Sequence, residues 1–182
     1  MTRAPAAATR HDAVGARDRL GVASLAPLAA GLPVLVLSSD GTGRVHATYS
    51  WAVAVDTRRL RLATDRGGRS SAHLRRSGRA ALLVVGHAGL NLLLSGRVQR
   101  LPAALDVAGS PPLDAWELTL SRVRDQSWPG VSTSVLRYRW PAPQRAAMRR
   151  MERAVIAALR HAAAPAPARR PAAARRRAGP QP

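Results

Sequence analysis

The chain has 182 residues, a formal net charge of +19 and no cysteine. The length favours a single domain with tails, and the missing cysteine excludes disulfides and thiol chemistry. All 29 basic residues are arginine, as in a GC-rich coding sequence, so charge alone is weak evidence for nucleic-acid binding. The longest apolar stretch, residues 22–37, is interrupted by serine, glycine and proline, and the N-terminus lacks the apolar core of a signal peptide. We therefore expect a cytoplasmic protein without a membrane span.

The first half of the chain predicts one short helix and three strands. Residues 1–19 are polar and alanine-rich, and we expect them to be flexible. A helix over residues 20–33 ends at Gly31 and Pro33. An Asp-Gly-Thr-Gly turn joins the two strands of a hairpin, and a stretch of alternating polar and apolar residues follows. The predicted strands are residues 34–38, 44–55 and 60–64.

The second half predicts another short helix, further strands and a long C-terminal helix. The short helix covers residues 70–76 and ends at Ser77-Gly78, where glycine supplies a left-handed residue. Strands are predicted at residues 80–85, 90–101, 115–125 and 133–140. The long helix, residues 141–163, is amphipathic, and one stripe carries Met148, Met151, Val155 and Leu159. This order fits a small antiparallel barrel better than alternating α/β units.

The tail, residues 163–182, is rich in alanine, arginine and proline. Such low-complexity composition predicts disorder. A flexible basic arm can bind nucleic acid or acidic lipids, and the alternative is a solvated extension. We therefore predict a folded domain over residues 20–162, with nucleic-acid binding confined to the tail.

A cluster of glycine, arginine and serine lies between the third strand and the short helix. The first N–H groups of a helix have no partners within the helix and attract phosphate. Gly67 and Gly68 let a ligand approach the backbone, and Arg69 can contact a phosphate in bidentate fashion. Hydroxyls that can donate to the phosphate belong to Thr64, Ser70 and Ser71. The alternative is that Ser70 or Ser71 caps the helix while the arginines are solvated.

The second strand, "HATYSWAV" at residues 46–53, is another candidate site. Its small polar groups at Thr48 and Ser50, with Tyr49 between them, could contact the edge of a planar cofactor. For Tyr49 and Trp51 the alternative is packing in the barrel core or at a dimer contact. Asp114 and Glu117 are separated by two residues and would face opposite sides of a strand, so they do not form an acid–base pair. The histidines show no metal-ligand spacing.

The run "LPVLVLSSDGTGRVHATYSWAVAVDTRRLRLATDRGGRSSAHLRRSGRAALLVV" and the strand "LLLSGRVQRL" follow the order of one family. Over residues 32–101 the chain resembles the pyridoxamine 5'-phosphate oxidase-like proteins, which are FMN-binding split β-barrels. The resemblance implies a mainly β (α+β) fold: an antiparallel split β-barrel with short flanking helices and a C-terminal helix. It also implies a homodimer that holds the flavin at its interface.

The resemblance assigns roles to individual residues. Thr64 matches a threonine that contacts phosphate, and Arg69 matches the arginine of a Ser-Arg-Lys signature. Gly68 and Ser70 replace the serine and lysine of that signature, and Arg66 is a candidate to supply the missing charge. In the pyridoxamine oxidases, an arginine stands at the position of Thr48 and a glutamine that reaches the flavin ring stands at the position of Asn91.

These observations predict a flavin-dependent oxidoreductase that binds FMN and acts on a small-molecule substrate. A deazaflavin or haem is the alternative cofactor. The Arg-Leu-His-Asp-Arg signature of vitamin B6 oxidases is missing from the second half, so that reaction is not expected. Two other functions stay open: a cofactor-free barrel dimer with a binding or structural role, and an Arg-rich nucleic-acid-binding protein.

Overall fold

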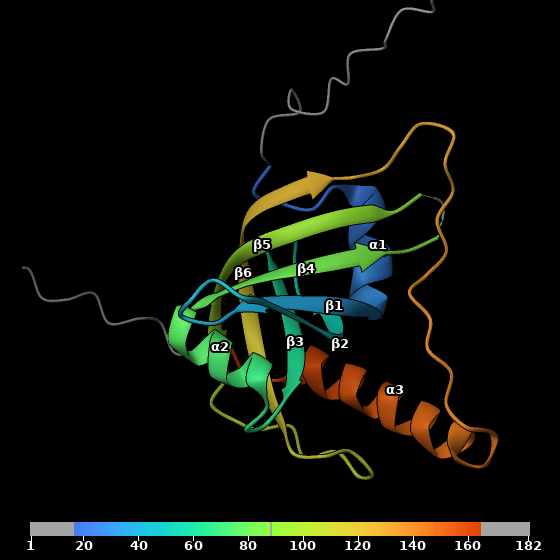
Figure 1. Ribbon diagram of the computed structural model, residues 1–182. Helices are drawn as coiled ribbons and strands as arrows, with labels where there is room; N and C mark the ends of the chain where they lie inside the picture. Colours follow the sequence, from blue (N-terminus) through green and yellow to red (C-terminus); the bar gives the residue numbers. More distant parts are fainter. Residues whose placement is uncertain (1–16, 88, 165–182) are drawn as a thin grey trace, which may run out of the picture.

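A computed structural model describes residues 17–87 and 89–164 of the chain. Six antiparallel strands close into a barrel in the order β1-β2-β3-β6-β5-β4 (Figure 1), which confirms the predicted fold class. Helix α1 precedes the barrel, α2 is inserted between β3 and β4, and α3 follows it. The elements are α1 (Val22–Ala30), β1 (Leu32–Ser39), β2 (Val45–Ala54), β3 (Arg59–Asp65), α2 (Arg69–Ser77), β4 (Arg79–Val85), β5 (Asn91–Arg100), β6 (Leu113–Asp125), a short 3-10 turn (Ala142–Gln144) and α3 (Arg145–His161).

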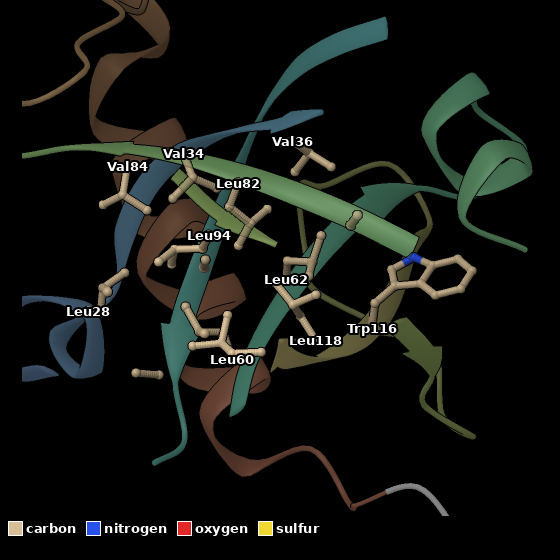
Figure 2. Close-up of a cluster of buried hydrophobic side chains, with 14 of the residues drawn as sticks. Leu28, Val34, Val36, Leu60, Leu62, Leu82, Val84, Leu94, Trp116 and Leu118 are labelled. Carbon is tan, nitrogen blue, oxygen red and sulfur yellow. The ribbon is translucent and has the colours of Figure 1, made fainter. Parts of the chain in front are cut away.

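Two apolar clusters lie on the two faces of the sheet. The inner cluster fills the barrel with leucine and valine side chains and a single tryptophan, Trp116 (Figure 2). The outer cluster lies between the sheet and α3, and Met151, Val155 and Leu159 of the helix are buried in it. The predicted stripe of α3 is therefore confirmed, with Met148 half-buried at its start.

The barrel is split between β2 and β3. These strands pair only where Ala52–Ala54 lie beside Leu60–Leu62. Beyond that point β3 continues to Asp65 in register with β6, whereas the first half of β2 pairs with β1 alone. Helix α2 packs beside the open end of the split, against β1, β2 and β3 (Figure 1). The split thus leaves space between strand ends and the beginning of a helix.

Two glycines are required by local geometry. Gly78 ends α2 with φ +62°, as the sequence predicts, and its N–H donates to the carbonyl of Leu74 at 2.9 Å. Gly96 lies at a register shift between β5 and β6, where an added Cβ would be 2.0 Å from the carbonyl oxygen of Thr119. A side chain at residue 96 would therefore force these two strands apart.

Residues 133–140 do not form the predicted strand. The segment runs along the barrel end, and its backbone contact is a hydrogen bond from the N–H of Leu136 to the carbonyl of Val85 at 3.3 Å. The alternation of arginine and aromatic residues in this segment does not reflect a strand. The Tyr138 and Trp140 side chains instead donate hydrogen bonds to Glu152 of α3. Side-chain packing against a helix, and not strand pairing, sets that alternation.

The end segments are only partly described. Arg17 forms a bridge with Val123 of β6, at the edge of the predicted flexible segment 1–19. Residues 1–16 and 165–182, which include most of the predicted tail, lie outside the described residues. Within residues 17–87 and 89–164, the helices are too short or too polar to cross a bilayer.

Candidate functional site

A pocket of about 80 Å³ lies in the split, between β2, the end of β3 and the beginning of α2. Six of the predicted site residues line it: Thr48, Tyr49, Ser50, Thr64, Arg69 and Ser70. The Ser50 hydroxyl donates to the carbonyl of Ala63 across the split, which ties the two strands together where their backbone pairing has ended. Residues far apart in the sequence therefore meet at the predicted phosphate site.

Helix α2 begins without a side-chain cap. Its N-cap is Gly68, in extended conformation, and the N–H of Gly68 donates to the carbonyl of Asp65 at 3.0 Å. Gly67 has φ +79°, which lets the chain turn sharply from β3 into the helix. The alternative that Ser70 or Ser71 caps the helix is therefore wrong. The N–H groups of the first turn remain without a side-chain acceptor, and they carry partial positive charge.

Ser70 and Arg69 have unused hydrogen-bonding capacity at this pocket. Ser70 is only 6 % exposed, and its Oγ has no hydrogen-bond partner. A buried hydroxyl without a partner costs about 1–3 kcal/mol, so a native structure rarely keeps one without a reason. The guanidinium of Arg69 is exposed and forms no ion pair within the described residues. This donor set fits a phosphate group.

The hydroxyls of Thr64 and Ser71 belong to a buried chain of hydrogen bonds behind the pocket. Trp116 Nε1 donates to Thr64 Oγ1 at 2.8 Å, and the Thr64 and Ser71 hydroxyl oxygens are 2.6 Å apart. The Ser71 hydroxyl in turn donates to Asp114 Oδ2 at 3.2 Å. Since Trp116 has only a donor, the chain is polarised from Trp116 toward the Asp114 carboxylate. In this arrangement both hydroxyls fix α2 against β3 and β6.

The carboxylate of Asp114 is fully buried and is surrounded by arginine. It accepts from Arg100 at 2.9 Å, from Arg75 at 3.1 Å and from Arg66 at 3.4 Å, and each of these arginine side chains is 45 % exposed. Arg66, which the sequence assigns to the phosphate, is thus turned toward Asp114. The cluster keeps two positive charges in excess beside the split, which favours an anion there.

Asn91 is not brought to the pocket within this chain. It begins β5, and its Nδ2 donates to the carbonyl of Gln126 at 3.2 Å. Tyr49 lines the pocket, and 52 % of the residue is exposed. Packing of Tyr49 in the barrel core is therefore excluded.

Sequence reasoning missed the roles of Asp114 and Trp116. The available signal was a carboxylate next to apolar residues at the start of a strand, in a chain with few acids.

A larger cavity of about 960 Å³ lies between residues 136–140 and α3, and Trp51 lines both cavities. We call it the aromatic–arginine groove; its lining residues are Pro33, Trp51, Leu136, Arg137, Tyr138, Arg139, Trp140, Arg145, Arg149, Glu152, Arg153 and Ile156. Burial and hydrogen bonding to Glu152 raise the pKa of Tyr138 well above its usual range. Its hydroxyl therefore remains protonated, and it remains a donor, at any physiological pH.

Comparison with known proteins identifies the family. The sequence model of the pyridoxamine 5'-phosphate oxidase family matches residues 25–127, whereas a search of curated proteins finds no significant match. Similar solved structures include a candidate pyridoxamine 5'-phosphate oxidase from Listeria innocua, with 14 % identity, a TM-score of 0.43 and coverage of 52 % of this chain and 87 % of that chain.

Two other solved structures align with this chain. A candidate 5-nitroimidazole antibiotic resistance protein from Bacteroides thetaiotaomicron has 10 % identity and a TM-score of 0.43, covering 58 % of this chain and 83 % of that chain. The flavin reductase of the styrene monooxygenase from Pseudomonas putida S12 has 14 % identity and a TM-score of 0.39, covering 57 % and 87 %. The family match includes all six strands of the barrel and the split with its pocket. The chain therefore belongs to the pyridoxamine 5'-phosphate oxidase family.

Proposed function

We propose that the protein binds FMN through the pocket in the split and acts as a flavin-dependent oxidoreductase on a small molecule. One observation carries the proposal: the buried Ser70 hydroxyl, without a partner, lies at the uncapped N-terminus of α2. A phosphate oxygen there would accept from this hydroxyl and from the free N–H groups. Membership of the family and the excess positive charge around Asp114 give further support.

The residues around the beginning of α2 have separate roles in this proposal. Ser70 and the first-turn amides would donate to the phosphate, and Arg69 would add a charge-assisted contact from the exposed side. Thr64 and Ser71 hold the beginning of α2 at its place on β3. When bound, FMN supplies the redox chemistry, and the protein supplies binding and orientation.

The size of the pocket limits what one subunit can enclose. Its volume of about 80 Å³ is below the roughly 300–1,000 Å³ of typical small-molecule sites, so it would hold the phosphate end only. The flavin ring would extend out of the pocket on the side that Thr48 and the exposed Tyr49 line. A second subunit would then cover the ring, and for this reason we propose a homodimer. Asn91 and the cytoplasmic location remain predictions from the sequence.

The test is titration of FMN with the full-length protein, in which the quenching of flavin fluorescence measures binding. We expect Arg69→Gln to weaken FMN binding about tenfold or more, because it removes a charge-assisted contact worth about 1.5–3 kcal/mol. Arg76→Gln is the matched control, since Arg76 lies in the last turn of the same helix and makes no ion pair within the described residues. Equal affinity of the two variants, or no FMN binding by the unaltered protein, contradicts the proposal and favours a cofactor-free barrel.

A further inference from the structure

We propose that His46, held in place by His73, links anion binding in the split to the uptake of a proton: a doubly charged phosphate group binds in the pocket together with a proton on His46. The proton step depends on the pocket alone, and the identity of the ligand as FMN rests on the proposed function. Arg69 cannot supply such a link, because an arginine keeps its charge at every physiological pH.

His46 belongs to the wall of the pocket in the split. It lies near the beginning of β2 and lines the pocket together with Arg69 and Ser70. Since successive side chains on a strand point to opposite sides, His46 is on the same side of β2 as Thr48 and Ser50, which also line the pocket. The pocket measures only about 80 Å³, so a phosphate bound at Ser70 would lie beside the imidazole as well.

A second histidine, His73 of α2, holds the ring of His46. The two rings pack edge-to-face, with centroids 5.9 Å apart and an angle of 86° between their planes. His73 Nδ1 is 3.1 Å from the hydroxyl oxygen of Ser38, a residue of β1 that is only 5 % exposed. A hydroxyl can donate or accept, so this contact persists whether His73 is neutral or charged. His73 is therefore a positioning residue for His46.

The formal charges of the pocket lining cancel while His46 is neutral. The lining has one carboxylate, Asp65, and one guanidinium, Arg69. Further charged side chains near the two histidines belong to the turn between β1 and β2 and to α2, outside the lining: Asp40, Arg44 and Arg76. A proton on His46 therefore changes the lining from neutral to cationic, and it offsets the repulsion between Asp65 and a phosphate.

The direction of the pH dependence follows from general chemistry. An ordinary imidazole takes up its proton near pH ~6.5, and a phosphate monoester loses its second proton near pH ~6. Just above neutral pH, a phosphate monoester is therefore a dianion and an ordinary histidine is neutral. An opposite charge nearby favours the charged form of a histidine, whereas two neighbouring imidazolium groups repel each other. Binding of the dianion thus takes up one proton from solvent, and affinity rises as the pH falls toward about 6.5.

Titration of FMN with the full-length protein at several pH values, by fluorescence quenching, tests the proposal. We expect FMN to bind about five- to tenfold more tightly at pH ~6.5 than at pH ~8.5. His46→Gln should show no such rise, and comparison with this variant cancels the titration of the phosphate itself. His87→Gln is the matched control, because His87 lies in the turn after β4, outside the pocket lining, and it should keep the full rise. Equal profiles for the unaltered protein and His46→Gln would overturn the proposal.

A count of protons separates a binding role of His46 from a structural one. Calorimetric titration in two buffers with different heats of ionisation measures the protons taken up when FMN binds. We expect uptake by the unaltered protein, none in His46→Gln and less in His73→Gln, where the ring of His46 is no longer held. Uptake that is unchanged in His73→Gln would overturn the role of His73. Riboflavin lacks the phosphate, and proton uptake with riboflavin would overturn the assignment to that group.

Two outcomes distinguish this proposal from the proposed function. If FMN binds without a pH profile that depends on His46, the proton link fails and the proposed function stands. If FMN does not bind at any pH, the proposed function fails, and inorganic sulfate, a dianion at every pH used, becomes the probe of the pocket. Sulfate binding with proton uptake that requires His46 would support the proton link without a flavin. No sulfate binding would overturn the proton link as well.

Discussion

Two carboxylates of β6, Asp114 and Glu117, illustrate how one interaction type can have two uses. Both are buried and both pair with arginine, and β6 aligns them with Thr64 and Arg61 of β3. Asp114 meets arginines whose side chains are 45 % exposed. Glu117 meets Arg61, and both of those side chains are only 6 % exposed. Asp114 and its arginines, which lie behind the pocket, are accessible to solvent, and we call them the open cluster. Arg61 and Glu117 are shielded from solvent, and we call them the closed pair.

The closed pair organises the barrel and not the pocket. Arg61 Nε donates to Glu117 Oε2 at 3.3 Å, and Arg61 Nη1 donates to the carbonyls of Leu159 and Arg160 at 3.1 and 3.0 Å. These carbonyls end α3, where helix carbonyls lack partners and carry partial negative charge. Glu117 therefore fixes the C-terminal end of α3 through Arg61, while Asp114 fixes the beginning of α2 through Ser71.

The largest expected effect is loss of the closed pair. Arg61→Leu leaves Glu117 buried without its main partner, and it also removes the donor to the end of α3. We expect the free energy of unfolding to fall by about 3–5 kcal/mol, measured by urea denaturation. Arg59→Leu is the control, because Arg59 is half-exposed and pairs mainly with Asp56; it should cost about 1 kcal/mol or less.

The double variant Arg61→Leu/Glu117→Leu tests the cause of that loss. Removing both charges leaves no unpaired carboxylate in the interior, and such replacements are often neutral or stabilising. We expect recovery of more than half of the stability lost in Arg61→Leu. No recovery would mean that the contact of Arg61 with the α3 carbonyls, and not the charge of Glu117, determines the effect.

Asp114→Asn should cost less, because its arginines can turn toward water. We expect a loss of about 1–3 kcal/mol, which shrinks at 1 M salt since the open cluster is exposed to screening. Ser71 also loses its charged acceptor in this variant, so the beginning of α2 is held less firmly on β6. A salt-independent loss as large as that of Arg61→Leu would show that the two clusters do not differ as argued.

Ser70→Ala should separate stability from binding. The variant removes a buried hydroxyl without a partner, so we expect stability to stay the same or rise by up to about 1 kcal/mol. FMN binding should weaken several-fold in the same variant, by fluorescence titration. A loss of stability would instead indicate that the hydroxyl has a structural partner, and it would weaken the argument for a phosphate at this position.

The barrel was predictable because its signals are local. The strand at residues 60–64 and the helical stripe that includes Met151 and Leu159 were predicted from sequence neighbours, and both elements are confirmed. The alternation typical of a half-exposed strand is not, because Arg61 and Thr64 are buried as well. The sequence likewise singled out the glycine pair and Arg69 at the beginning of α2. The role of Asp114 was not predictable, because its partners come from the loop after β3, from α2 and from β5, which only the closed barrel brings together.

The strand prediction for residues 133–140 is wrong for a related reason. Alternating aromatic and arginine residues predict a half-exposed strand when only sequence neighbours are considered. The segment instead places Tyr138 and Trp140 against Glu152, a residue on a helix that follows it. Nothing in the local pattern distinguishes packing on a helix from pairing in a sheet. The groove therefore could not be predicted before the fold was known.

Asp56 offers a half-exposed carboxylate for comparison with the two buried ones, and it carries the smallest expected effect. Partial burial alone would raise its pKa, but hydrogen bonds from the N–H of Arg58 and from the side chain and N–H of Arg59 outweigh burial and lower it. A lowered pKa in the folded state stabilises the fold above the unfolded value of about 3.9. That contribution is lost as the pH falls through the lowered pKa. Thermal unfolding should therefore show Asp56→Asn slightly less stable than the unaltered protein at pH 6, with the difference vanishing in strong acid. A difference that persists unchanged in strong acid would mean that the charge of the Asp56 carboxylate does not cause it.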